Sequence, residues 1–109
     1  MTRPIMIALL LLPFGSLAAT AADDGIIKRP ATGCMSKAAM VRAHELREQR
    51  DPAAVQLLLS EGLRSGDCRP FAPGEPVIVE DNDILAGISK VHTPGDPQAF
   101  WVPDRAVDD

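Results

Sequence analysis

The chain has 109 residues, a hydrophobic fraction of 46% and a formal net charge of −4 at pH 7. A chain of this length can form one small domain and is too short to build a second hydrophobic core. The charge is uneven, because residues 28–69 hold eight Lys/Arg against five Asp/Glu, whereas residues 70–109 hold two against eight. The acidic second half argues against nucleic-acid binding, which depends on a basic patch.

Residues 1–21 have the three-part pattern of a secretory signal peptide: Arg3, an apolar run over residues 5–14, and then small residues. The run is too short to cross a hydrocarbon core of about 30 Å as a helix. We expect cleavage after Ala21, with Ala18 as the alternative position and an uncleaved anchor helix as the other interpretation. The mature protein would be periplasmic or secreted in a bacterium, with no stable membrane insertion. Residues 22–33 are expected to be its flexible N-terminus.

Residues 34–109 are predicted to form a single α+β domain. Its two cysteines, Cys34 and Cys68, are expected to form a disulfide, because an even count in an exported chain favours pairing. The bond should stabilise the fold by roughly 3–4 kcal/mol in the chain-entropy model. A pair of free thiols is the alternative, although no CxxC spacing suggests a redox catalyst.

Two helices are predicted within residues 36–64. The first begins at Ser36, a good N-cap, and ends near Gln49. The second follows Asp51-Pro52, because Pro suits the first helical position, and it ends before Gly66. The spacing predicts two buried faces, made of Met35, Ala39, Ala43 and Leu46 in the first helix and of Val55, Leu58, Leu59 and Leu63 in the second. The short link predicts an antiparallel hairpin, tied at its open end by the disulfide.

The β part is predicted over residues 70–107. Val77-Ile78-Val79 is a β-branched run, and residues 80–83 form a polar corner. Residues 84–92 alternate loosely and predict a second strand, and a Pro/Gly turn over residues 93–97 separates it from a third strand over residues 98–102. Residues 104–107 are compatible with one short 3₁₀ turn. Antiparallel strands of this length bury a face only by curling or by packing on the helices.

The series "GEPVIV", "GISKV" and "FWVPDRAV" resembles the closing half of a Src-homology-3-like small barrel. The resemblance covers residues 72–107, and Trp101-Val102-Pro103 and Val107 take the places of the family's last strand and final valine. It implies an antiparallel sheet or barrel, in a layout similar to small uncharacterised exported bacterial proteins. In the family's peptide-binding members the groove contains a tyrosine, whose position falls on Ala106, and the chain has no tyrosine.

A candidate binding edge is predicted around Phe100, Trp101 and Asp104. Adjacent residues of a strand point to opposite faces, so the two rings cannot both face the core of a one-sided sheet. We expect Phe100 and Val102 to point inward and Trp101 to be partly exposed, either as a lid over the sheet edge or as a ligand contact.

Patterns that would indicate catalysis or metal binding are incomplete. His44 is followed at the fifth position by Glu48, where a zinc metalloprotease helix needs a second His, so an ordinary surface pair is expected. Asp81-Asn82-Asp83 lacks the ligand spacing and the glycine of a calcium loop. The serines Ser36, Ser60, Ser65 and Ser89 lack a recognisable nucleophile context. We therefore predict no catalytic residues, no metal site and no cofactor.

The arginines of the helical half, Arg42, Arg47, Arg50 and Arg64, either present a mildly basic face to an anionic surface or simply solvate the helices. The functional prediction is a non-enzymatic binding or adaptor module of the bacterial cell envelope, with a protein or peptidoglycan as its partner. The alternatives are an exported inhibitor of a hydrolase such as lysozyme, whose basic charge would suit the acidic half, and an enzyme.

Overall fold

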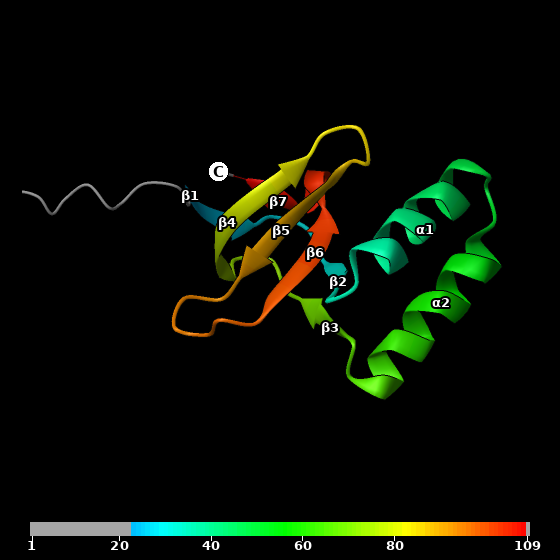
Figure 1. Cartoon of the computed structure of the whole chain (residues 1–109), viewed down its shortest axis with the longest axis horizontal. Coiled ribbons are helices and arrows are strands. Elements are labelled where there is room, and N and C mark those ends of the chain that lie inside the picture. The colour runs from blue at the N-terminus through cyan, green and yellow to red at the C-terminus, as the bar shows by residue number, and fades with distance from the viewer. Residues whose placement is uncertain (1–22, 109) are drawn as a thin grey trace, which may run out of the picture.

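The computed structural model describes residues 23–108, which form an α+β fold of seven strands, two α-helices and a 3₁₀ turn (Figure 1). The elements are β1 (Asp23–Ile27), β2 (Ala31–Cys34), α1 (Lys37–Glu48), α2 (Pro52–Ser65), β3 (Cys68–Phe71), β4 (Pro76–Asp83), β5 (Ile88–His92), β6 (Ala99–Pro103), the 3₁₀ turn Asp104–Ala106 and β7 (Val107–Asp108). The predicted signal peptide lies outside the described residues.

Side-chain caps define both helices as the sequence predicts. The Ser36 hydroxyl accepts a hydrogen bond from the Ala39 amide (3.1 Å), and the Asp51 carboxylate accepts one from the Ala54 amide (3.2 Å). Gly66 ends α2 in the left-handed conformation, with φ of 90°. Each cap satisfies backbone groups that the helix itself leaves without partners.

A disulfide joins Cys34 to Cys68, as predicted. The two residues face each other directly in the β2–β3 ladder. Cys34 lies just before α1 and Cys68 just after α2, so the bond closes the segment that carries both helices. Figure 1 shows α1 and α2 side by side, at one end of the sheet.

All strand pairs are antiparallel, and the strand order is β3-β2-β6-β5-β4-β1-β7. The first strand, β1, pairs with β4 on one side and with the last strand, β7, on the other. The prediction of a flexible segment over residues 22–33 is therefore wrong, because β1 and β2 occupy most of it. The predicted polar corner at residues 80–83 is also wrong, because these residues continue β4 as far as Asp83.

The sheet buries side chains on both of its faces. The inner cluster contains Ile27, Phe71, Val77, Val79, Val91 and Val102, with Phe100 and Val107 packed against it. The outer cluster contains Cys34, Met40, Cys68, Ile88 and Trp101, and lies between the sheet and the helices. Consecutive residues of β6 therefore belong to different clusters, because side chains alternate along a strand.

The buried faces of the helices differ in part from the prediction. In α1 the buried residues are Met40, Ala43 and Leu46, whereas Met35 is 37% exposed. In α2 only Val55 is buried, and Leu63 is 43% exposed. Because α2 packs mainly on α1 and β3 at the edge of the molecule, most of its leucine face has no second layer to cover it.

Candidate functional site

Trp101 is buried, with 8% of its surface exposed, so its predicted partial exposure is wrong. Its ring packs with Met40, Ile88 and the disulfide under the helices. The Lys37 ammonium lies 4.9 Å from the ring centroid, a favourable cation–π position. The tryptophan therefore holds α1 on the sheet and is not accessible to a ligand.

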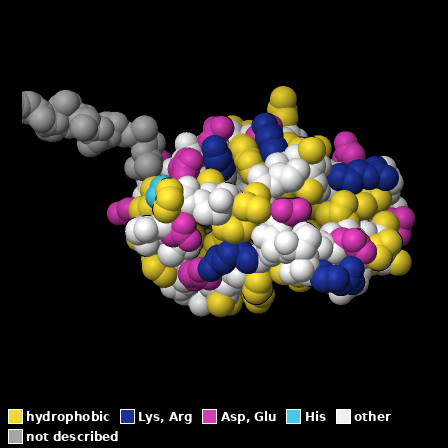
Figure 2. All heavy atoms as spheres, turned by 60° about the horizontal axis from the view of Figure 1, so that its bottom comes forward, with side chains coloured by type: hydrophobic (Ala, Val, Ile, Leu, Met, Phe, Trp, Pro, Cys, Tyr) yellow, Lys and Arg dark blue, Asp and Glu magenta, His cyan; other side chains and the backbone are white. Residues whose placement is uncertain are grey.

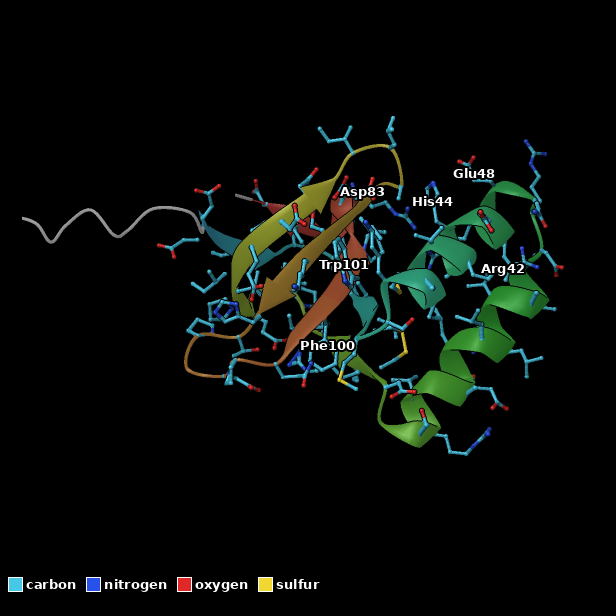
Figure 3. All side chains as sticks on the ribbon, viewed as in Figure 1. Arg42, His44, Glu48, Asp83, Phe100 and Trp101 are labelled. Atoms are coloured by element: carbon cyan, nitrogen blue, oxygen red, sulfur yellow. A yellow bond between two sulfur atoms is a disulfide. The ribbon has the colours of Figure 1, made fainter. Side chains whose placement is uncertain are left out.

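Phe100 points to the opposite side of β6 from Trp101 and is half-buried against the inner cluster (Figure 3). Its ring meets that of Phe71 edge to face, with 5.8 Å between centroids. The Arg69 guanidinium stacks 3.8 Å from the Phe71 centroid and forms an ion pair with Glu75. This arrangement closes the inner core at the β3 side of the sheet.

Asp104 takes part in a polar network that joins β4, β5 and the 3₁₀ turn. The Ser89 hydroxyl donates to its carboxylate, and the Asn82 side-chain amide donates to both Ser89 (2.9 Å) and Asp104 (3.2 Å). Ser89 is 4% exposed, and the shallow pocket here is lined by Val79, Asn82, Ser89, Asp104 and Val107, with no imidazole among them. A serine and a carboxylate without a base between them do not make an activated nucleophile.

The three residues of the predicted binding edge thus lie in three environments and form no common surface. Trp101 faces the helices, Phe100 faces the inner core, and Asp104 anchors a turn. An alanine substitution at Trp101 would therefore disturb packing and could not report ligand binding.

The remaining polar residues that the sequence singles out have local partners. His44 pairs with Glu48 across one turn of α1 at 3.6 Å, as expected of a surface pair. The carboxylates of Asp81 and Asp83 diverge, since Asp81 accepts from the Asn82 amide and Asp83 pairs with Lys37. Within residues 23–108 no group of three His, Cys, Asp or Glu side chains is placed to hold a metal ion.

A groove of about 370 Å³ passes the disulfide between the start of α1 and the end of α2. It is lined by Cys34, Ser36, Ala39, Leu58, Glu61, Gly62, Ser65, Asp67 and Cys68. Its two hydroxyls already have structural roles, because Ser36 caps α1 and Ser65 donates to the Gly62 carbonyl. Both sulfur atoms are bonded to each other, so the groove offers no thiol chemistry.

The strongest candidate for a binding site is the turn between β4 and β5, residues 84–87. It presents two adjacent large aliphatic side chains, Ile84 (81% exposed) and Leu85 (98% exposed), which are the most exposed large hydrophobic residues of the described chain. Exposed aliphatic residues are common singly, and these two are singled out because they are neighbours on one turn and nearly fully exposed. We call these two residues the apolar tip.

The turn that carries the apolar tip is well braced. Asp83 accepts a hydrogen bond from the Ala86 amide (3.0 Å) and pairs with the Lys37 ammonium (2.8 Å). The Lys37 hydrogen bond, followed by that from Ala86, lowers the pKa of Asp83 below its usual range. Gly87 ends the turn with φ of 70°, and its carbonyl accepts from the Asp104 amide (2.9 Å). The tip is therefore held between α1 and the 3₁₀ turn.

Sequence reasoning missed this site because it counted Ile84 and Leu85 as the start of an alternating strand. The relevant signal is local: an Asp whose side chain can accept from the amide three residues later, followed by a Gly suited to positive φ, indicates a tight turn. Asp83 and Gly87 enclose such a turn.

No family model, curated protein or solved structure matches the chain. Neither helix of residues 23–108 combines the length and hydropathy that crossing a bilayer requires.

Proposed function

We propose that the protein is a non-enzymatic binding or adaptor module of the bacterial cell envelope that docks a protein partner through the apolar tip. The observation that carries the proposal is the near-complete exposure of Ile84 and Leu85 on a braced turn. Fully burying such a side chain in a partner is worth about 1.5–3 kcal/mol. A turn that is already ordered loses little conformational freedom on binding, so more of that free energy remains as affinity.

Other polar groups support a non-enzymatic role. The Ser36 hydroxyl caps α1, the Ser65 hydroxyl donates to the Gly62 carbonyl, and the Ser89 hydroxyl donates to the Asp104 carboxylate. The His92 ring pairs with the Glu80 carboxylate on the neighbouring strand, and its hydrogen bond is to Glu80 and not to any of these hydroxyls. The disulfide supports export, because such bonds persist in oxidising compartments.

We further infer that the sheet is a Src-homology-3-like barrel with an unusual insertion. The connectivity supports this: β1 pairs with β4 and with β7, and a 3₁₀ turn joins β6 to β7. In this interpretation the β2–β3 hairpin is the first long loop of the barrel, and the two helices are carried at its end as a hairpin of their own. The helices then lie over Trp101, on a face that an insertion-free barrel would leave open.

Site-specific photocrosslinking in intact native cells tests the docking role. A photoreactive amino acid placed at Leu85 should give a discrete crosslinked product, whereas the same group at Leu57, an exposed leucine of α2, is the matched control. A second reporter, with the photoreactive group at the neighbouring Ala86, should give the same product. That product should disappear when Ile84→Ser and Leu85→Ser are introduced together. Equal products from positions 85 and 57, or none from position 85, would reject the tip as the docking site.

Peptidoglycan is the competing partner, and it can be separated from a protein partner directly. Retention of the protein on insoluble peptidoglycan, unchanged by Ile84→Ser and Leu85→Ser, would favour a glycan contact elsewhere on the surface. Loss of retention in the tip variant would make the wall itself the occupant of the tip.

An exported inhibitor of a basic hydrolase such as lysozyme is the second candidate, favoured by the eight acidic residues among residues 70–109. Titration into a lysozyme lysis assay tests it. An undiminished lytic rate at molar excess of the protein would dismiss that target.

A further inference from the structure

Two arginines close to the apolar tip have no ion-pair partner among residues 23–108. Arg47, in the last turn of α1, and Arg105, in the 3₁₀ turn, take part in no ion pair within the described residues, whereas Arg42, Arg64 and Arg69 each contact a glutamate. Partial burial of Arg47, together with repulsion by the charge of Arg105, lowers the pKa of Arg47. The fold thus holds two like charges near each other, and neither forms an ion pair with a described residue.

These arginines and the apolar tip belong to one corner of the molecule. The Gly87 carbonyl, at the end of the tip turn, accepts from the amide of Asp104, the residue before Arg105. A Cβ at Gly87 would lie 3.3 Å from the His44 ring, and His44 precedes Arg47 by one helical turn. We call Ile84, Leu85, Arg47 and Arg105 together the tip corner. Figure 3 shows His44 on the side of α1 that is turned toward the β4–β5 loop.

We propose that the tip corner binds a protein segment that presents a carboxylate beside an apolar side chain; this rests on the proposed docking function and specifies its partner. The planar guanidinium fork matches a carboxylate with two parallel hydrogen bonds. A carboxylate near both arginines would also remove their mutual repulsion. Ile84 and Leu85 supply the apolar anchors around which interface contacts usually gather.

The surrounding charge favours a single acidic side chain over an anionic lipid surface. Recognition of anionic lipids typically uses clusters of about 4–8 Lys/Arg. The tip corner has two, and the carboxylates of Glu48, Asp83 and Asp104 lie on the same elements. Over the helices, Figure 2 shows Asp/Glu side chains interspersed with Lys/Arg, with no continuous basic face in that view.

An NMR titration of the ¹⁵N-labelled protein tests the inference with two blocked tripeptides, Glu-Leu-Glu and its neutral counterpart Gln-Leu-Gln. The acidic peptide should shift the side-chain Nε–H signals of Arg47 and Arg105 and the backbone amides of residues 84–87. Arg105→Ala should weaken its binding about tenfold, equivalent to about 1.4 kcal/mol. The matched control is Arg42→Ala, because Arg42 is exposed and already paired with Glu45.

The possible outcomes separate this inference from the docking function. If both tripeptides bind equally and Arg105→Ala has no effect on binding, the proposed preference for a carboxylate is wrong. The docking function is tested separately, by crosslinking from position 85. Acidic-peptide shifts that spread equally over Arg42 and Arg64 would also overturn the inference. The inference would also be overturned if the protein sediments with phosphatidylglycerol vesicles and the Arg105→Ala variant does not. The tip corner would then bind a membrane and not a protein segment.

Discussion

Gly62→Ala should destabilise the protein, although Gly62 lies in the interior of α2, where alanine is normally preferred to glycine. A Cβ built at this position would lie 2.1 Å from the Cys68 sulfur and 3.0 Å from its Cβ. The missing side chain lets α2 approach the disulfide, and the sulfur has no freedom to move away because it is bonded to Cys34.

The net effect of Gly62→Ala is a balance of two opposing contributions. Alanine is favoured over glycine in a helix interior by about 0.8–1 kcal/mol. Overpacking of a rigid site costs about 1–3 kcal/mol, and a 2.1 Å approach to a crosslinked sulfur belongs at the upper end. We therefore expect a net loss of about 1–2 kcal/mol, which lowers the Tm of a domain of this size by roughly 5–15 °C.

A double-mutant cycle isolates the part of this loss that the disulfide causes. Urea unfolding followed by fluorescence of the single tryptophan gives the free energy of unfolding of the protein, of Gly62→Ala, of Cys34→Ala/Cys68→Ala and of the combined variant. Sodium sulfate in all samples favours burial and keeps the variants without the disulfide folded. Without the sulfur, the cost should fall by most of the overpacking contribution, because only the 3.0 Å contact with the Cβ of residue 68 then opposes the helix preference.

Gly66→Ala is the matched control. Nothing lies within 4 Å of a Cβ at Gly66, so its cost comes only from φ of 90° and should be equal with and without the disulfide. The reasoning fails if Gly62→Ala stabilises the crosslinked protein, or if its cost is the same in both backgrounds.

Three further predictions concern the core, the crosslink and the braced turn. Gly33→Ala should lower the free energy of unfolding by about 1–3 kcal/mol in urea titrations, since a Cβ there would lie 2.6 Å from a ring carbon of an inner-core phenylalanine; an unchanged midpoint would contradict this. Cys34→Ala with Cys68→Ala should cost about 4 kcal/mol for a sequence separation of 34, measured in the same way, and a cost near zero would contradict the chain-entropy estimate. The pKa of Asp83 is lower in the folded protein than its ordinary value of 3.8. The ion pair of Asp83 with Lys37 therefore stabilises the fold above about pH 3.8, and this stabilisation is lost as the pH falls through the folded-state pKa of Asp83. Thermal unfolding of the protein and of Asp83→Asn should therefore differ at pH 6 and converge at lower pH; a constant difference would contradict it.

The helices were predictable because their signals are local. Ser36 and Asp51 are caps by side-chain chemistry, and Gly66 ends α2 because it accepts a positive φ. The disulfide was predicted from the even cysteine count together with the signal-peptide pattern that indicates export.

The first two strands were not predictable because their stability comes from partners far along the chain. Residues 22–33 contain Gly, Pro and charged residues and show no regular alternation. β1 exists because β4 and β7 flank it, and Gly25 fits there because side chains of Val79 and Val107 approach its backbone closely.

The error at Trp101 has a different origin. The alternation of β6 was predicted correctly, since Phe100 and Val102 face the inner cluster and Trp101 faces away. What failed was the assumption that only one face of the sheet is covered. One face packs into the inner cluster and the helices cover the other, and the inner cluster includes residues of β1 and β7, which are distant in sequence and pair with each other.

The direct pairing of Cys34 with Cys68 means that the polypeptide leaves the sheet and returns to it at a single point. The 33 intervening residues contain no strand, so no strand register depends on a residue of that segment for pairing. A chain of this design could exchange its helices for a different cap, provided that the replacement still shields Ile88 and Trp101 from water.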